Sequence, residues 1–258
     1  MCEDERHAEW GKLAADADIE AGKHLPSPAA LATIREALDR ARERLGSEDA
    51  GRHRIPFRRQ RWHFGGTALP AASVTREYIS RQDGFDVGKQ PQTPAANWQL
   101  FCTSFIFGYG RSGLGPIRFR RITGRTAPQD LSAVVAEARR RLAQCGPLSA
   151  YDYLRGSGSQ RTVPYWGPAF FTKLLYFADT SGKTLILDNQ IARTVHTMSG
   201  MEHLVGRYGR SECWTAWRYG VYLAWMCRVA DALEVQPDFL EYALFMEAKQ
   251  RRPRRRRT

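Results

Sequence analysis

Apolar residues recur every three or four positions in several stretches of the chain, which is the spacing of an amphipathic helix. Residues 26–45 have this spacing and stop at Gly46, so they predict a helix that ends at a glycine. Residues 130–145 predict a second helix, with Asp130 as a candidate N-cap. Further helices are predicted over residues 148–155, 168–178, 191–204, 212–233 and 238–249, the last with a start signal at Pro237-Asp238.

Strand-like alternation of apolar and polar residues is rare. Residues 98–109 form a short apolar run that fits either a buried helix or a strand. Residues 47–95 are rich in Gly, Pro and Arg and predict no clear element, and no internal repeat is visible. The pattern as a whole predicts a mainly α protein without a substantial sheet.

The composition indicates a folded protein. A chain of 258 residues can form one large domain or two small ones, and a 43% hydrophobic content excludes a wholly disordered protein. No apolar run approaches the roughly 18 residues that span a bilayer, and the first ten residues are charged where a signal peptide is apolar. The cysteines and histidines form no C-x-x-C or H-x-x-x-H pair. We therefore expect a soluble cytoplasmic protein with no bound metal.

The charge is strongly positive and comes mostly from arginine. The net charge is +12, with 33 Arg and 6 Lys, and residues 251–258 alone carry six Arg. Two further clusters comprise Arg52, Arg54, Arg58, Arg59 and Arg61, followed by Trp62, and then Arg118, Arg120, Arg121 and Arg125. Arginine next to aromatic residues suits phosphate contact and base stacking, although a solvated surface has the same composition. The charge favours a nucleic-acid partner.

Residues 108–113 match the G-x-G-x-x-G pattern of dinucleotide-binding folds. That motif requires a helix to start at its third glycine, and we expect Gly115-Pro116 to obstruct such a helix. No alternation of strands and helices surrounds the motif. It therefore predicts a glycine-rich turn, and we expect no nucleotide cofactor.

Residues 162–193 hold the candidate chemistry. Gly167 permits a tight turn and Pro168 suits the first helical position, so the following N–H groups could anchor a phosphate. Lys173 is the only charged residue of the predicted helix 168–178, and we expect it to face a cleft or water. An amine can lose its proton and attack carbon, whereas arginine stays protonated; an ordinary surface lysine is the alternative. Asp188 precedes the next predicted helix and fits an N-cap, or a fixed anion beside the amine.

A glycine-containing hairpin, a helix bearing Lys173 and a following Asp188 resemble the helix-hairpin-helix DNA glycosylases, the group that includes the 8-oxoguanine glycosylases. The sequence WGPAFFTKLLYFA of residues 166–178 is similar in particular to bacterial proteins described as having an 8-oxoguanine glycosylase fold, and residues 107–116 and 237–245 fit the same set. The resemblance implies a mainly α fold in which two helical subdomains flank a cleft. It divides the chain into a helical or irregular region of unknown role (1–97), a glycosylase-like domain (98–250) and a disordered Arg-rich tail (251–258).

The resemblance also implies roles for individual residues. Lys173 would attack C1′ of a flipped nucleotide, and Asp188 would assist departure of the base and stabilise the cationic sugar, so that a Schiff base and β-elimination could follow. The expected contacts to the DNA backbone come from Trp166, Gly167, Pro168, Ala169 and Thr172. The candidates for the base pocket, each of which also fits a core position, are Trp98, Phe101, Phe105, Trp214 and Trp217.

The sequence departs from the family pattern at three points. Tyr165 stands where the hairpin has its first glycine, and Ala169 stands where bifunctional members have the catalytic lysine, one helical turn before Lys173. Only the Asp of the Gly-Pro-Asp triplet is present, as Asp188. If Lys173 only positions DNA, Asp188 would activate water and the enzyme would be monofunctional.

The expected partner is double-stranded DNA with a damaged or modified base. An 8-oxoguanine-like purine is the default substrate, and a hypermodified base of phage DNA is the alternative. We expect a monomer associated with the bacterial nucleoid. A non-catalytic helix-hairpin-helix DNA-binding protein, or an unrelated helical nucleoprotein, remains an alternative.

Overall fold

The computed structural model describes residues 3–62, 77–156, 162–205 and 214–250. The chain divides into two compact units, one formed by residues 1–12 and 51–186 and the other by residues 13–50 and 187–258. These bounds differ from the segments 1–97 and 98–250 drawn from the sequence, since each unit joins an N-terminal piece to a distant part of the chain. The Arg-rich tail lies outside the described residues.

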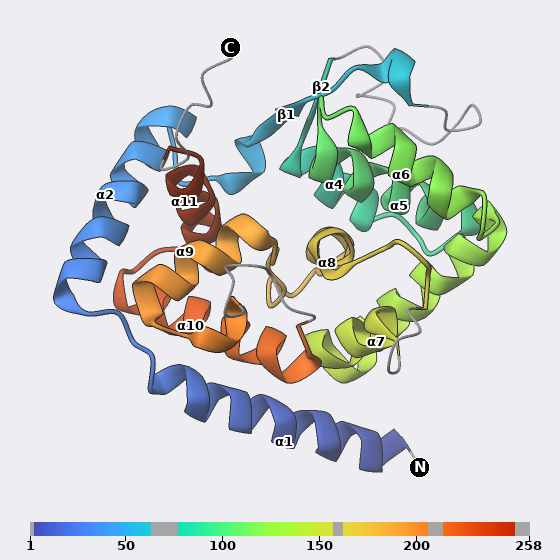
Figure 1. Ribbon diagram of the computed structural model, residues 1–258. Helices are drawn as coiled ribbons and strands as arrows, with labels where there is room; N and C mark the ends of the chain where they lie inside the picture. Colours follow the sequence, from blue (N-terminus) through green and yellow to red (C-terminus); the bar gives the residue numbers. More distant parts are fainter. Residues whose placement is uncertain (1–2, 63–76, 157–161, 206–213, 251–258) are drawn as a thin grey trace. The chain divides into compact units, whose positions relative to one another are not determined.

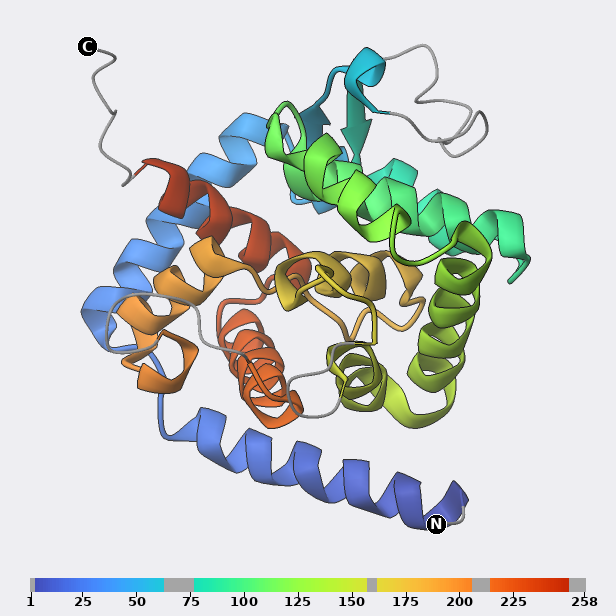
Figure 2. The same ribbon diagram turned by 45° about the vertical axis from the view of Figure 1, so that its right-hand side comes forward.

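The first unit is built around helix α5 (Pro94–Tyr109). Against it pack α4 (Arg81–Gly88), α6 (Leu114–Thr123), α7 (Pro128–Arg155) and α8 (Pro168–Ala178). In both views of the ribbon, α6 runs alongside α5 (Figures 1 and 2). Nearly every side chain between residues 100 and 107 of α5 is buried, so the apolar run 98–109 is a core helix and not a strand.

The sheet is small, as the sequence predicted. Strands β1 (Arg54–Pro56) and β2 (Tyr78–Ser80) pair antiparallel, with Ile55 opposite Ile79. Two 3₁₀ turns, η1 (Ala50–Arg52) and η2 (Arg59–Arg61), flank β1. Most of the described chain is α-helical, which confirms the predicted fold class.

The second unit contains α2 (Pro28–Leu45), α9 (Asn189–Ser199), η3 (Glu202–Leu204), α10 (Ala216–Ala232) and α11 (Pro237–Gln250). Helix α11 contacts α2, α9 and α10 and so forms the centre of this unit. Helix α1 (Glu3–Gly22) starts in the first unit, and its later part belongs to the second.

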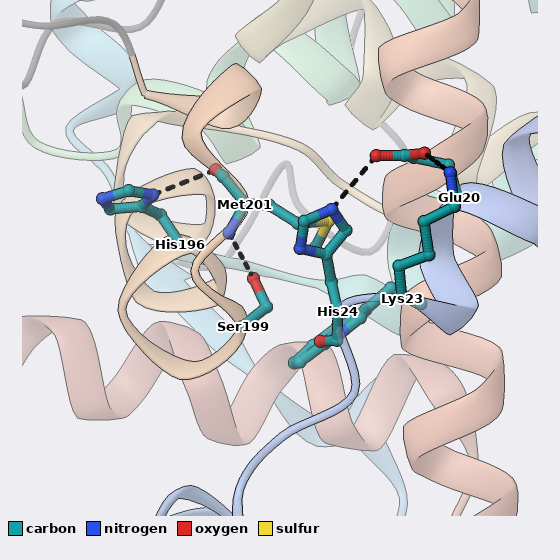
Figure 3. A network of polar contacts seen from close by, with 7 residues as sticks. Glu20, Lys23, His24, His196, Ser199 and Met201 are labelled. Atoms are coloured by element: carbon teal, nitrogen blue, oxygen red, sulfur yellow. Dashed lines mark hydrogen bonds and ion pairs between the residues drawn. The ribbon is translucent and has the colours of Figure 1, made fainter.

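Polar contacts join the pieces of the second unit. Arg228 of α10 pairs with Asp18 at 2.7 Å, and Trp225 Nε1 donates to the carbonyl oxygen of His24 at 2.8 Å. Figure 3 shows His24 beside Glu20, with 3.1 Å between Nε2 and Oε1. In the same view His196 Nδ1 lies 2.9 Å from the carbonyl oxygen of Met201. These contacts tie the end of α1 to α10, and the end of α9 to the chain that follows it.

Several predicted helices are confirmed with their end signals. Helix α2 starts after Ser27, whose side chain accepts from the N–H of Ala30, and ends at Gly46 with a φ of +67°. Helix α8 covers residues 168–178, and α11 begins at Pro237. Helix α10 begins at Ala216, within the predicted range 212–233, whose first two residues lie outside the described part of the chain.

Two expectations about helix starts are wrong, and one about a helix break is confirmed. Ala127, and not Asp130, is the N-cap of α7, because the helix starts two residues earlier, at Pro128. The break between the predicted helices 130–145 and 148–155 is confirmed, because Gly146 is non-helical, with a φ of +81°, and divides α7 into two helical segments. Helix α6 does start next to Gly113, because Pro116 lies in the first turn, where a missing N–H breaks no helical hydrogen bond.

The G-x-G-x-x-G motif still differs from a dinucleotide site in its surroundings, since helix α5 and not a strand precedes it. In the described residues, no helix is both long and apolar enough to cross a membrane.

Candidate active site

Helix α8 begins after a residue that provides no side-chain capping hydrogen bond. Pro168 is the first helical residue, as the sequence predicted, and Gly167 is the N-cap residue. The N–H groups of Phe170 and Phe171 both donate to the carbonyl oxygen of Gly167, at 2.9 and 3.1 Å. Within the described residues, the N–H groups of Gly167 and Ala169 have no hydrogen-bond partner. These two donors lie at the positive end of the helix dipole, where a phosphate is stabilised.

Tyr165 makes a turn of the kind that usually needs glycine. Its φ is +67°, in the left-handed region that glycine enters without strain and most other residues avoid. The side chain is 42% exposed, and the guanidinium of Arg125 lies 5.4 Å from the centre of its ring. A residue with a glycine-like backbone conformation therefore occupies the position where the family pattern has glycine.

Lys173 is a buried lysine whose amine is turned back toward the start of α8. The residue is 6% exposed, and Nζ donates to the carbonyl oxygen of Ala169 at 2.7 Å. Side chains of a helix lean toward its N-terminus, so the amine lies one turn before its own Cα, at the level of Ala169. Thr172 is buried as well, and its hydroxyl donates to the carbonyl oxygen of Pro168 at 2.8 Å.

A glycine of α5 makes room for Lys173 and its neighbour Phe170. A Cβ atom at Gly108 would lie 2.8 Å from Cδ1 of Phe170 and 3.3 Å from Cδ of Lys173. The Phe170 ring is 5.8 Å from Nζ of Lys173 and stacks on Tyr109 with 4.4 Å between ring centres. Both aromatic rings are half-buried. The sequence placed Gly108 in a turn, and its packing role next to the candidate amine was missed.

A buried arginine lies against the same helix. Arg81 is 1% exposed, and its Nη1 donates to the hydroxyl of Tyr176 at 3.1 Å. Its guanidinium also lies over the rings of Tyr176 and Phe107, at 5.2 and 6.0 Å. Tyr176 follows Lys173 by three residues, so one face of α8 carries both contacts. No sequence signal pointed to this pair, because 95 residues separate its members.

Asp188 is the N-cap of α9, which confirms the predicted cap. Its Oδ1 accepts hydrogen bonds from the N–H groups of Gln190 and Ile191, at 2.9 and 3.1 Å. This fixes the carboxylate at the positive end of a helix. Asp188 belongs to the second unit and Lys173 to the first.

The candidate pocket aromatics divide between the two units. In the first unit Phe101 and Phe105 are fully buried, and Trp98 is half-buried and stacks on Phe101. In the second unit Trp214 is buried and donates from Nε1 to the carbonyl oxygen of Leu204, while Trp217 is half-buried beside His203.

Trp166, expected to contact the DNA backbone, is a core residue. It is 1% exposed and packs edge-on against Phe101, with 5.0 Å between ring centres. Any contact of this residue with DNA would therefore use its backbone.

The arginine clusters lie on the surface of the first unit. All members of the cluster on α6 and its C-terminal end are exposed: Arg118, Arg120, Arg121 and Arg125. Arg58 and the two arginines of η2 are exposed too. Among the described residues, no group of three or more His, Cys, Asp or Glu is placed to hold a metal ion.

Comparison with known proteins shows a family relationship over most of the chain. Neither a curated protein nor a solved structure matches the chain. A family model, "Putative 8-oxoguanine DNA glycosylase OGG-like protein", matches residues 48–245. The match spans the α5 core, the uncapped start of α8, Lys173 and Asp188. The chain belongs to this OGG-like family.

Proposed function

We propose that the protein is a DNA glycosylase that flips a damaged or modified base out of double-stranded DNA and excises it. Membership of the OGG-like family supports this reaction class. The observation that carries the proposal is the placement of Lys173, a buried amine turned toward the open N–H groups at the start of α8. A phosphate held by those groups would bring the sugar of the flipped nucleotide within reach of the amine.

The chemistry follows from an amine and a fixed carboxylate. After losing its proton, Lys173 Nζ attacks C1′, and the N-glycosidic bond breaks as the base leaves with the bonding electrons. Asp188 stabilises the positive charge that develops on the sugar and assists departure of the base. The C1′–O4′ bond of the sugar then opens, O4′ takes up a proton, and the amine nitrogen and C1′ become a Schiff base. Loss of a proton from C2′ expels the 3′ phosphate, and this β-elimination cleaves the strand on the 3′ side. In this scheme the enzyme is a glycosylase with lyase activity.

In an alternative mechanism, water and not the Lys173 amine is the nucleophile. Lys173 donates to the carbonyl oxygen of Ala169, a contact that also suits a residue that only positions DNA. Asp188 would then activate water, and the enzyme would release the base without cleaving the strand. The remaining alternative, a non-catalytic DNA-binding protein, would use the start of α8 and the exposed arginines alone.

The proposed substrate is an 8-oxoguanine-like purine in a duplex, and the proposed alternative is a hypermodified base of phage DNA. Weakly paired bases are favoured, because unstacking costs a few kcal/mol. We propose that the protein acts as a monomer and needs no cofactor.

Base release from duplexes with single modified bases tests the proposal. Free base is measured by mass spectrometry, and strand cleavage is measured before and after alkali. The variants are Lys173→Ala and Asp188→Asn, with Lys183→Ala, an exposed lysine beyond α8, as the matched control. We expect the control to match the wild type and the two site variants to lose roughly 100-fold or more in rate.

Other outcomes select among the alternatives. Base release that persists in Lys173→Ala but is absent in Asp188→Asn would show that the nucleophile is water activated by Asp188 and not the Lys173 amine. If the wild type releases no base from any oxidised or hypermodified duplex, the proposed glycosylase activity is wrong. The non-catalytic DNA-binding protein is then the alternative that stands.

A further inference from the structure

Helix α6 exposes two large aliphatic side chains. Leu114 is 61% exposed and Ile117 is 43% exposed, although both lie in an ordered helix. The opposite face, with Phe119 and Ile122, is buried against the unit. The exposed pair therefore does not contribute to packing of the helix against the unit. Neighbouring exposed apolar side chains can form part of an interaction site.

Positive charge surrounds the pair. Arg118 and Arg121 follow Leu114 by four and seven residues, so they lie on the same face of α6 as the two aliphatic side chains. Arg111 is exposed just before the helix. The sequence contains no acidic residue between Asp86 and Asp130. A polyanion is thus the partner that this face fits by charge.

The first turn of α6 packs beside the candidate site through its buried side. At the start of the helix, a Cβ at Gly115 would lie 2.7 Å from Cβ of Tyr109, whose ring stacks on Phe170 beside Lys173.

The other end of α6 lies near the hairpin before α8. Arg125, two residues after the helix, stacks over Tyr165. Helix α6 therefore extends from the surroundings of the amine to the turn that begins α8. All of these contacts lie within the first unit.

We propose that Leu114 and Ile117 form an apolar wedge that enters the base stack of duplex DNA and fills the space left by the flipped nucleotide. Proteins that kink DNA insert Leu, Ile, Phe or Met between base steps, while arginines hold the flanking phosphates. Here Arg111, Arg118 and Arg121 would hold the phosphates. The inference rests on the proposed function, because it assumes that a nucleotide leaves the stack.

A stable abasic analogue separates insertion from excision. The probe is a duplex with a tetrahydrofuran site next to 2-aminopurine, whose fluorescence rises when stacking is lost. The test variant is Leu114→Ala/Ile117→Ala, and the matched control is Ile19→Ala/Leu25→Ala, which removes two exposed aliphatic side chains of the second unit. Thermal unfolding checks that both variants fold.

We expect the wild type and the control to raise the fluorescence and the wedge variant to lose that rise. Its preference for the tetrahydrofuran duplex over an intact duplex should fall about tenfold, on the order of what burying one large aliphatic side chain contributes. Its salt dependence should stay unchanged. Arg118→Ala/Arg121→Ala should instead weaken binding to both duplexes and lower the slope of log K against log salt by about 2.

The two proposals fail in different ways. Loss of the fluorescence rise in the wedge variant, together with no base release by the wild type, would support the wedge and overturn excision. An unchanged rise and unchanged preference in the wedge variant, with base release intact, would overturn the wedge and keep the function. Unchanged DNA binding combined with self-association that the wedge variant loses would also overturn the wedge and mark the face as a protein contact.

Discussion

At the scale of single residues, the backbone conformation before α8 and the space beside it help to position the candidate amine. Tyr165 holds a left-handed φ before the helix, and Gly108 leaves room for Phe170 and Lys173 beside it. The sequence identified Lys173 because it is the only charged residue on an apolar helix. It could not reveal that Nζ folds back to Ala169, or that Arg81 meets Tyr176, because both depend on packing between distant segments.

Replacing Tyr165 tests the strain in the turn. Tyr165→Val should lower the free energy of unfolding by about 1–2 kcal/mol, because a β-branched residue fits the left-handed region poorly. Tyr165→Gly removes this strain but also the ring over Arg125, so its net effect should stay within about 1 kcal/mol. Urea unfolding measures both values. A Val variant as stable as the wild type would contradict the assigned φ.

Gly108→Ala tests the packing around the amine. The new methyl group would overlap the Phe170 ring, which Tyr109 and Phe105 hold by stacking. Overpacking should destabilise the protein by about 1–2 kcal/mol, after a helix-propensity gain of about 0.5–1 kcal/mol is included. Base release should fall because the Lys173 side chain is displaced.

The matched control for this variant is Gly113→Ala, where a Cβ meets no atom within 4 Å. It should change stability by less than about 0.5 kcal/mol. Equal effects of the two substitutions on urea unfolding and base release would contradict the packing role of Gly108.

At the scale of elements, the sequence predicted a helix end well where a few neighbouring residues determine it. Ser27 and Gly46 mark the ends of α2, and Pro168 marks the start of α8, because capping depends on a few neighbouring residues. The break at Gly146 was predicted correctly, whereas the start of α6 before Pro116 was not, because Pro116 was expected to obstruct a helix. Pro116 is tolerated because it lies in the first turn of α6, where its missing N–H breaks no helical hydrogen bond.

The contact between η3 and the end of α1 should make the second unit sensitive to acid. Burial, and then the neighbouring His24 and Arg218, lower the pKa of His203, while Glu20 opposes this shift weakly. The folded state therefore binds fewer protons than the unfolded state at low pH. Stability is fully present above the unfolded pKa of about 6.5 and declines as the pH falls below it.

His203→Phe should remove much of this decline, because the ring contact with Trp217 remains while the titrating group is lost. The measurement is the free energy of unfolding between pH 7.5 and pH 5, obtained in urea. An identical pH slope in the variant and the wild type would show that other groups cause the decline.

At the scale of the whole molecule, the candidate groups come from two units. The start of α8 and Lys173 belong to one unit, whereas Asp188 begins α9 in the other. The sequence predicted both residues as candidates, and each of the two units combines segments far apart in the chain. Charge also acts at this scale, because residues 251–258 carry half of the net charge of +12.

Removing residues 251–258 should weaken DNA binding mainly through electrostatics. Six arginines are lost, so the slope of log K against log salt should fall by up to about 5. The rate of base release from the saturated complex should stay unchanged if the tail lies outside the site. Binding titrations at several salt concentrations and single-turnover rates measure both. A lower single-turnover rate would place the tail in the reaction.

Borohydride trapping tests the central claim, that the Lys173 amine is the nucleophile. The protein is incubated with a duplex carrying a single 8-oxoguanine or hypermodified base and reduced, and the adduct is located by peptide mass spectrometry. We predict a covalent adduct on Lys173 that is lost in Lys173→Ala and retained in Lys183→Ala. An adduct on another amine, or an adduct that persists in Lys173→Ala, would contradict the account.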